Sequence, residues 1–274
     1  MDTIVRTISL EESSEVISQL EKKEFLWEYG VKVYSQNQED GILYYLLSKL
    51  KERTKIAVEL GAGDGIECNT GFLVRHHGYT SYMIDGSPYW LEKGIDAYQT
   101  MNIKGKPLFI CSWITKENII ELLDQNVVPK EIDILSVDID GNDYWILEEI
   151  YKCKRLSPKI IVVEYQDIIG PEKALSIPYS PYFNHTQYDC WNGPNYCGAS
   201  LPAFIYLLKK DYAFIGCEGQ GFNGFFVRRD LLSEMNLEEM KDIHPCFTME
   251  KVQFGMKHRF PRTSHMKWVQ IDKK

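Results

Sequence analysis

The sequence predicts an α/β protein with a Rossmann-like, doubly wound and mostly parallel sheet that ends in an antiparallel hairpin. Between residues 56 and 163, short apolar runs recur without strict alternation, as expected of strands that are buried on both faces. Segments long enough for helices separate these runs. Further along, two apolar runs flank a short glycine-rich turn over residues 218–221, which makes them antiparallel neighbours.

The expected elements follow one another along the chain. Residues 1–33 are predicted to form an N-terminal helical extension, and residues 34–274 a single α/β domain. Residues 9–29 are polar and helix-prone, and Ser9 and Glu12 have the spacing of a capping box. Helices are expected over 38–52, 69–76, 89–98, 116–125, 144–153 and 201–209, and strands over 56–60, 80–84, 107–111, 132–137, 160–163, 212–216 and 222–227.

The composition excludes several classes of protein. The chain has 274 residues, is 44% hydrophobic and carries a net charge of −8, without the long Lys and Arg runs of a nucleic-acid-binding protein. No apolar run approaches the roughly 20 residues that span a bilayer, and no signal peptide is visible, so we expect no membrane insertion. Seven scattered cysteines favour reduced thiols in a cytoplasmic protein. The oligomeric state stays open.

A glycine-rich loop, Gly61-Ala62-Gly63-Asp64-Gly65, follows the first expected strand of the sheet. Such a loop either brings the backbone close to a ligand, which would be NAD, FAD or S-adenosylmethionine, or is simply a tight turn. A dinucleotide would place its pyrophosphate near Asp64, and the third glycine of the G-x-G-x-x-G pattern would fall on Ile66. S-adenosylmethionine has no phosphate and carries two cationic groups, which the carboxylates of Glu59 and Asp64 favour. The loop therefore favours S-adenosylmethionine, and an NAD-dependent oxidoreductase is the alternative.

The next two strand ends complete the predicted cofactor pocket. Asp85 and Gly86 end the second strand, and Asp85 lies 26 residues after Glu59, one strand–helix–strand unit later. A carboxylate at this position accepts hydrogen bonds from both hydroxyls of a ribose. Ser112 and Trp113 follow the third strand, where an adenine ring would lie. Trp113 packs either on that ring or into the core.

Four acids follow the fourth and fifth expected strands: Asp138, Asp140 and Asp143 after the fourth, and Glu164 at the end of the fifth. Because parallel strand ends open onto one edge, Asp138 and Glu164 are expected to repel each other, which raises a pKa or recruits a cation. We predict an Mg²⁺ or Mn²⁺ site of Asp138, Glu164 and Asp140, where the ion would activate a hydroxyl. Asp140 stays open as ligand, general base or turn former, and Asp143 is expected to cap the next helix. The alternative is a set of loop acids that only solvate the sheet edge.

An aromatic stretch over residues 179–196 is expected to lie over the cleft, where its rings pack against a sugar or merely against one another. His185 within it is a candidate general base or fourth metal ligand, or a structural histidine. Three residues before the first strand are expected to line the same cleft: Gln36, Gln38 and Glu39. His76 and His77 are expected at the surface.

Together these features resemble a class I S-adenosylmethionine-dependent methyltransferase over roughly Tyr34–Asp230. More narrowly, Ser35–Gly41, the Asn69-Thr70 pair and Phe225–Arg228 resemble the FkbM-like methyltransferases. This resemblance implies an O-methyltransferase that acts on a sugar or glycan hydroxyl, and the alternative is a catalytically inactive partner of a glycan-building enzyme. The usual Asp-x-Glu-Gly of that group reads Asp138-Ile139-Asp140-Gly141 here, so the second acid reaches less far.

The predicted site residues fall into three sets. The predicted cofactor contacts are Glu59, Gly61, Ala62, Gly63, Asp64, Asn69, Asp85, Gly86, Ser112, Trp113 and Asp138. The predicted catalytic residues are Asp138, Asp140 and His185, and the predicted metal ligands are Asp138, Glu164 and Asp140. The predicted partner is a small-molecule or glycan acceptor.

Overall fold

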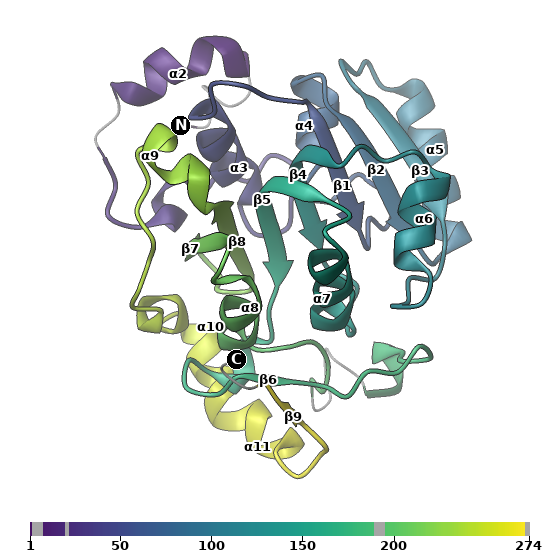
Figure 1. Cartoon of the computed structure of the whole chain (residues 1–274), viewed down its shortest axis with the longest axis vertical. Helices are drawn as coiled ribbons and strands as arrows, with labels where there is room; N and C mark the ends of the chain where they lie inside the picture. The colour runs from purple at the N-terminus through teal and green to yellow at the C-terminus, as the bar shows by residue number, and fades with distance from the viewer. Residues whose placement is uncertain (2–7, 20–21, 189–194, 272–274) are drawn as a thin grey trace.

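A seven-stranded sheet forms the centre of the computed structural model, which describes residues 1, 8–19, 22–188 and 195–271 (Figure 1). The strand order is β3-β2-β1-β4-β5-β8-β7. The five parallel strands are β1 (Ile56–Leu60), β2 (Thr80–Asp85), β3 (Lys106–Cys111), β4 (Glu131–Val137) and β5 (Ser157–Glu164). The antiparallel strands β8 (Asn223–Arg228) and β7 (Tyr212–Cys217) close the sheet beside β5. The predicted fold class is confirmed.

Helices cover both faces of this sheet. The helices that precede or connect the strands are α3 (Glu39–Ser48), α4 (Gly71–His76), α5 (Pro88–Thr100), α6 (Ile119–Gln125), α7 (Asp143–Cys153) and α8 (Leu201–Leu208). One hydrophobic core joins α3 and α4 to the sheet, and another joins α6, α7 and α8 to its other face. Figure 1 shows α7 and α8 in the foreground and α3 behind the strands. In β1, Val58 and Leu60 enter one core and Ala57 the other, which explains the unbroken apolar run.

The expected strands and core helices are confirmed, with ends that differ by at most four residues. The helix expected from residue 116 begins three residues later, because Thr115 and Asn118 form a turn in which the Thr115 N–H donates to Asn118 Oδ1 at 2.8 Å. The expected surface position of His77 is wrong. This ring is buried, with 7% of its area exposed, and it packs edge-on against Phe72.

The N-terminal residues pack against the α3 side of the sheet. The capping box is confirmed, because the Glu12 N–H donates to Ser9 Oγ at 3.3 Å and the Ser9 hydroxyl donates to Glu12 Oε2 at 3.1 Å. The helix that it starts, α2 (Leu10–Ser18), covers less of the chain than the helix-prone stretch. A single 3₁₀ turn, η1 (Leu26–Tyr29), follows, and its buried ends contribute to the core. The division into an extension and a domain stays a prediction.

Short elements gather beyond the carboxyl ends of the parallel strands, at the bottom of Figure 1. They are η2 (Asp167–Ile169), β6 (Leu175–Ser176), η3 (His185–Tyr188), η5 (His244–Phe247), α10 (Glu250–Phe254), η6 (Gly255–Arg259), α11 (Phe260–Thr263) and β9 (Val269–Gln270). Another pair, η4 (Arg229–Leu231) and α9 (Leu232–Met235), follows β8. None of the described helices combines the length and apolar character needed to cross a membrane.

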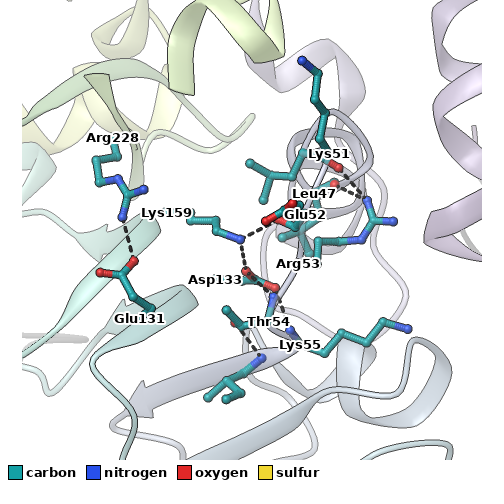
Figure 2. A network of polar contacts seen from close by, with 12 residues as sticks. Leu47, Lys51, Glu52, Arg53, Thr54, Lys55, Glu131, Asp133, Lys159 and Arg228 are labelled. Atoms are coloured by element: carbon teal, nitrogen blue, oxygen red, sulfur yellow. Dashed lines mark hydrogen bonds and ion pairs between the residues drawn. The ribbon is translucent and has the colours of Figure 1, made fainter. Parts of the chain in front are cut away.

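The amino ends of the strands carry an amino-edge network around Asp133 of β4, whose side chain is fully buried (Figure 2). Its carboxylate accepts from the backbone N–H of Thr54 and Lys55, the Tyr79 hydroxyl and the Lys159 ammonium, at 2.9–3.0 Å. Four donors, one of them cationic, satisfy the buried charge. The buried charge of Asp133 at this end of the sheet is therefore compensated within the protein and needs no ligand.

Candidate active site

The loop after β1 turns back over the end of β2. The N–H groups of Gly61 and Ala62 both donate to the carbonyl of Ile84, at 2.9 and 3.1 Å. Gly61 has a φ of +84°, and a Cβ atom there would lie 1.6 Å from the carbonyl oxygen of Asp138. Gly63 has a φ of +55°, and a Cβ atom there would meet nothing within 4 Å. The first glycine therefore lets two loops touch, and the second lies beside open space.

The carboxylate of Asp85 joins this loop to the start of α5. Its Oδ2 accepts from the Gly63 N–H at 2.8 Å and its Oδ1 from the Ser87 N–H at 2.7 Å. A carboxylate has about four acceptor positions. Two acceptor positions therefore remain for the donors of a ligand, as the prediction for a ribose requires.

Glu59 lies beneath the loop with 2% of its area exposed. Burial raises the pKa of its carboxyl to about 7, and hydrogen bonds from Ser136 and Thr70 oppose that rise. The Thr70 N–H donates to Glu59 Oε2 at 2.8 Å, and Asn69 Nδ2 donates to Ser136 Oγ at 3.0 Å. A cation beside this carboxyl would favour its ionised form.

Two adjoining cavities open at this edge of the sheet. The tryptophan cavity, about 400 Å³, is lined by Gly61, Gly63, Asp85, Gly86, Ser87, Trp90, Trp113, Ile114, Asp138, Ile139, Asp140, Asn142, Phe183, Asn184 and His185. The carboxylate cavity, about 370 Å³, is lined by Gln36, Glu39, Glu59, Gly61, Ala62, Gly63, Asp64, Glu67, Cys68, Asn69, Trp90, Asp138, Asp140 and Asn223. Because five residues line both, the cavities are two halves of one cleft.

Ten of the predicted cofactor contacts line this cleft, and Ser112 does not. The Ser112 hydroxyl lies 3.5 Å from the carbonyl of Trp113. Trp113 is 52% exposed, and its indole N–H donates to the carbonyl of Pro181 at 2.9 Å. A Cβ atom at Gly86 would lie 2.8 Å from the Trp113 ring, so this glycine allows the indole to approach. The binding roles of all these residues stay predictions.

Asp138 and Asp140 line both cavities, and Glu164, which is not among the lining residues of either, lies close to both acids. Each offers one carboxylate oxygen, and these oxygens lie within 4.8 Å of one another. Asp138 follows β4 and Glu164 ends β5, which are adjacent parallel strands. Burial and mutual repulsion raise the pKa of both Asp138 and Glu164, and the two carboxyls are hydrogen-bonded to each other. Such a pair holds a proton or binds a cation.

Asp143 shapes the turn that presents Asp140. Its Oδ1 accepts from the Ile139 N–H at 2.7 Å and its Oδ2 from the Gly141 N–H at 2.8 Å. Burial raises the pKa of Asp143 to about 6. Asp140 adopts a φ of +55°, which is strained for a residue with a Cβ atom. Its Oδ2 lies 3.7 Å from Nδ1 of His185, so two of the predicted catalytic residues are neighbours.

Part of the aromatic stretch forms one wall of the tryptophan cavity. Phe183 stacks on Tyr188 with ring centroids 5.4 Å apart, and a Cβ atom at Gly141 would lie 2.3 Å from the Phe183 ring. Tyr179 instead donates to Glu117, away from the cleft. The aromatic and amide residues predicted over 189–194 lie outside the described residues.

Sequence reasoning missed several polar or aromatic residues of the cleft, among them Glu67, Trp90, Asn142 and Asn223. Trp90 lines both cavities from the first turn of α5. Asn142 and Asn223 are 4% and 5% exposed, and the side-chain oxygen of each has no hydrogen-bond partner among the described residues. Asn223 pairs with Glu164 across the antiparallel strands. That register depends on tertiary structure, which no motif in the sequence reveals.

Comparison with known proteins gives one family. The model of the methyltransferase FkbM domain matches residues 31–188, which is more than half of the chain. This stretch contains the glycine loop, Asp85 and the acids that follow β4 and β5. No curated protein matches the chain.

Solved methyltransferase structures are similar to the chain at low identity. Precorrin-6y C5,15-methyltransferase from Geobacter metallireducens is 20% identical over 49% of this chain and 65% of its own, with a TM-score of 0.30. The SAH-bound Podospora anserina methyltransferase PaMTH1 is 18% identical over 64% and 72%, with a TM-score of 0.40. The O-methyltransferase from Bacillus cereus in complex with SAH is 12% identical over 84% and 92%, with a TM-score of 0.45. The chain thus spans about two thirds of the first of these, and the similarities say nothing about its reaction.

Proposed function

This chain belongs to the FkbM methyltransferase family, and from that premise we propose that it transfers a methyl group from S-adenosylmethionine to a hydroxyl of a sugar or glycan, assisted by a divalent metal ion. One observation carries the proposal. The glycine loop with Asp85 and the carboxyl group of Asp138 line one cleft, so a cofactor and an activated hydroxyl would meet there.

The residues present fit S-adenosylmethionine, which supplies a methyl group on a sulfonium sulfur. The open space beside Gly63 and the two remaining acceptor positions of Asp85 suit a ribose. The exposed indole of Trp113 offers a face for an adenine ring. The positive charge of the ligand would favour the ionised form of Glu59, whose pKa is about 7. These residues would bind and orient the cofactor, and they would take no part in the methyl transfer itself.

The three clustered acids fit a divalent cation. Asp138, Asp140 and Glu164 would hold Mg²⁺ or Mn²⁺, because carboxylate oxygens are the ligands that these ions prefer. The ion would supply a lowered pKa for the acceptor hydroxyl. It would also offset the repulsion that raises the pKa of Asp138 and Glu164. His185, whose Nδ1 lies 3.7 Å from Oδ2 of Asp140, would take the proton of that hydroxyl.

A sugar acceptor is supported by the aromatic wall of the cleft. Phe183 and the exposed indole of Trp90 are rings of the kind that pack on the C–H face of a pyranose. Asn184 beside them offers both a donor and an acceptor for sugar hydroxyls. An inactive partner of a glycan-building enzyme would have no need of the clustered carboxyls, since such a cluster is costly to bury.

Binding and activity measurements test the proposal. We expect calorimetry to detect S-adenosylhomocysteine and not NAD, and binding of NAD alone would restore an oxidoreductase. Labelled S-adenosylmethionine should label a sugar acceptor, whereas cofactor binding without transfer across a broad acceptor panel would favour the inactive partner. EDTA should abolish transfer and leave the affinity for S-adenosylhomocysteine unchanged, and added Mn²⁺ should restore activity. Full activity in EDTA would contradict the metal ion.

A further inference from the structure

The cleft contains an excess of carboxyl groups. Six of them line the carboxylate cavity: Glu39, Glu59, Asp64, Glu67, Asp138 and Asp140. Among the described residues, no Lys or Arg lines either this cavity or the tryptophan cavity. A ligand that brings positive charge is therefore favoured.

One part of the carboxylate cavity has no role in binding the cofactor or the metal ion under the proposed function. It is lined by Gln36, Glu39, Glu67 and Asn223. These residues come from the loop before α3, the glycine loop region and the start of β8. Since the three segments meet beside Asp138 and Asp140, an acceptor whose hydroxyl lies beside these acids would extend into this part.

The polar groups of this part are arranged to accept hydrogen bonds. Asn223 Nδ2 donates to Glu39 Oε1 at 2.8 Å, and the other oxygen of Glu39 accepts from the Asn37 N–H at 2.7 Å. Because a carboxylate only accepts, this contact fixes which end of the amide carries the oxygen. Asn223 is 5% exposed, and in the part of the chain that the structure describes its Oδ1 has no hydrogen-bond partner. An unpaired buried acceptor is costly and calls for a donor.

Given the proposed function, on which this step rests, we propose that the acceptor carries an ammonium group, as in an amino sugar, and that Glu39, Glu67 and Asn223 receive it. An ammonium group offers three donors and one positive charge, which match one unpaired amide oxygen and two carboxylates. A phosphorylated, nucleotide-linked or carboxylated sugar would bring negative charge into a cleft without a cationic side chain among its described residues. The structure thus narrows the acceptor from sugars in general to aminated ones.

A binding experiment on the full chain separates this inference from the proposed function. The protein is first loaded with S-adenosylhomocysteine and then titrated by ligand-observed NMR with glucosamine, glucose and glucose 6-phosphate. We expect glucosamine to bind at least about tenfold more tightly than glucose, the scale of a charge-assisted hydrogen bond, and glucose 6-phosphate not to bind. Failure to bind S-adenosylhomocysteine would contradict the proposed function itself. Cofactor binding with equal affinities, a preference for the phosphate or no binding of glucosamine would overturn only the ammonium acceptor.

Glu67 offers a variant with little risk to folding, because its side chain is exposed. Glu67→Gln should weaken glucosamine binding about threefold, within the range of an exposed ion pair, and leave glucose unchanged. Glu250→Gln, an exposed acid of α10 outside both cavities, is the matched control and should change neither. An equal loss for glucose and glucosamine in Glu67→Gln would contradict the recognition of charge at this position.

Discussion

The amino ends and the carboxyl ends of the parallel strands place aspartate residues in opposite electrostatic environments. On β4, Asp133 near the amino end is surrounded by four hydrogen-bond donors, one of them the ammonium group of Lys159 (Figure 2). Five residues later, Asp138 faces Glu164 and Asp140, and no cationic group lines its cavities among the described residues. A satisfied buried charge serves stability, whereas crowded carboxyls are retained for binding or catalysis. From this contrast we interpret Asp133 as a structural acid and Asp138 as a candidate functional one, without reference to any motif.

The largest expected effect is at the amino edge. Asp133→Ala should lower the free energy of unfolding by about 3–5 kcal/mol, because it leaves the ammonium of Lys159 buried without its partner. Urea unfolding measures the change. Glu131→Gln, on the same strand but 57% exposed, is the control and should cost less than about 1 kcal/mol. Similar losses of unfolding free energy in both variants would contradict a special structural role for Asp133.

Asp138→Asn tests the other edge. We expect methyl transfer to fall by about 10²-fold or more, the scale of losing one preorganised electrostatic group. The free energy of unfolding should stay unchanged or rise, since the change removes a like charge beside Glu164. Unfolding and single-turnover measurements on one preparation give both numbers. A large loss of stability would show instead that Asp138 stabilises the fold, as Asp133 is expected to do.

The pH dependence of stability should report the burial of Glu59 beneath the glycine loop. The native pKa of Glu59, about 7, lies above its ordinary value of 4.5, so the native state binds more protons than the unfolded state between these values. The stability of the cofactor-free protein should therefore fall as the pH rises from about 5 to 8. Glu59→Gln should reduce this fall by about 2.5 kcal/mol, the part of a shift of about 2.5 units that falls within this pH range. Denaturant titrations at several pH values measure it, and identical slopes in both proteins would contradict the raised pKa.

The smallest expected effect concerns the aromatic wall. Trp113→Ala should weaken the binding of S-adenosylhomocysteine about fivefold, since one stacked ring contributes about 1 kcal/mol. Calorimetry measures the change. Phe254→Ala on α10, an aromatic residue that is 59% exposed outside the cleft, is the control. Unchanged affinity in Trp113→Ala would place the adenine ring elsewhere.

The sequence predicts the sheet and one side of the cleft because both follow from local patterns. Unbroken apolar runs identify buried parallel strands, and parallel strands bring their carboxyl ends to one edge. The positions of Asp85, Asp138 and Glu164 at that edge could therefore be predicted without knowing any contact. Their binding and catalytic roles stay predictions.

What the sequence does not reveal depends on long-range contacts. Nothing near Asp133 in the chain indicates that Lys159, on the next strand, reaches it. The place of Asn223 in the cleft depends on the register between β5 and β8. The burial of His77 likewise depends on Tyr44 and Phe72, which come from two helices. Charge pairing and register, rather than secondary structure, are what a single sequence leaves undetermined.

The contact of Gly61 with the carbonyl of Asp138 has a consequence for protein engineering. A side chain at position 61 would displace the turn that carries the clustered acids, because no space separates the two backbones. The glycine loop and the turn that carries Asp138 and Asp140 are thus in direct backbone contact, so a change in one loop would displace the other. Acceptor specificity is better altered through Gln36 and Glu39, which line the cleft from the start of α3 and the loop before it. A library of variants at these positions would test new acceptors while the binding site for the methyl donor stays unchanged.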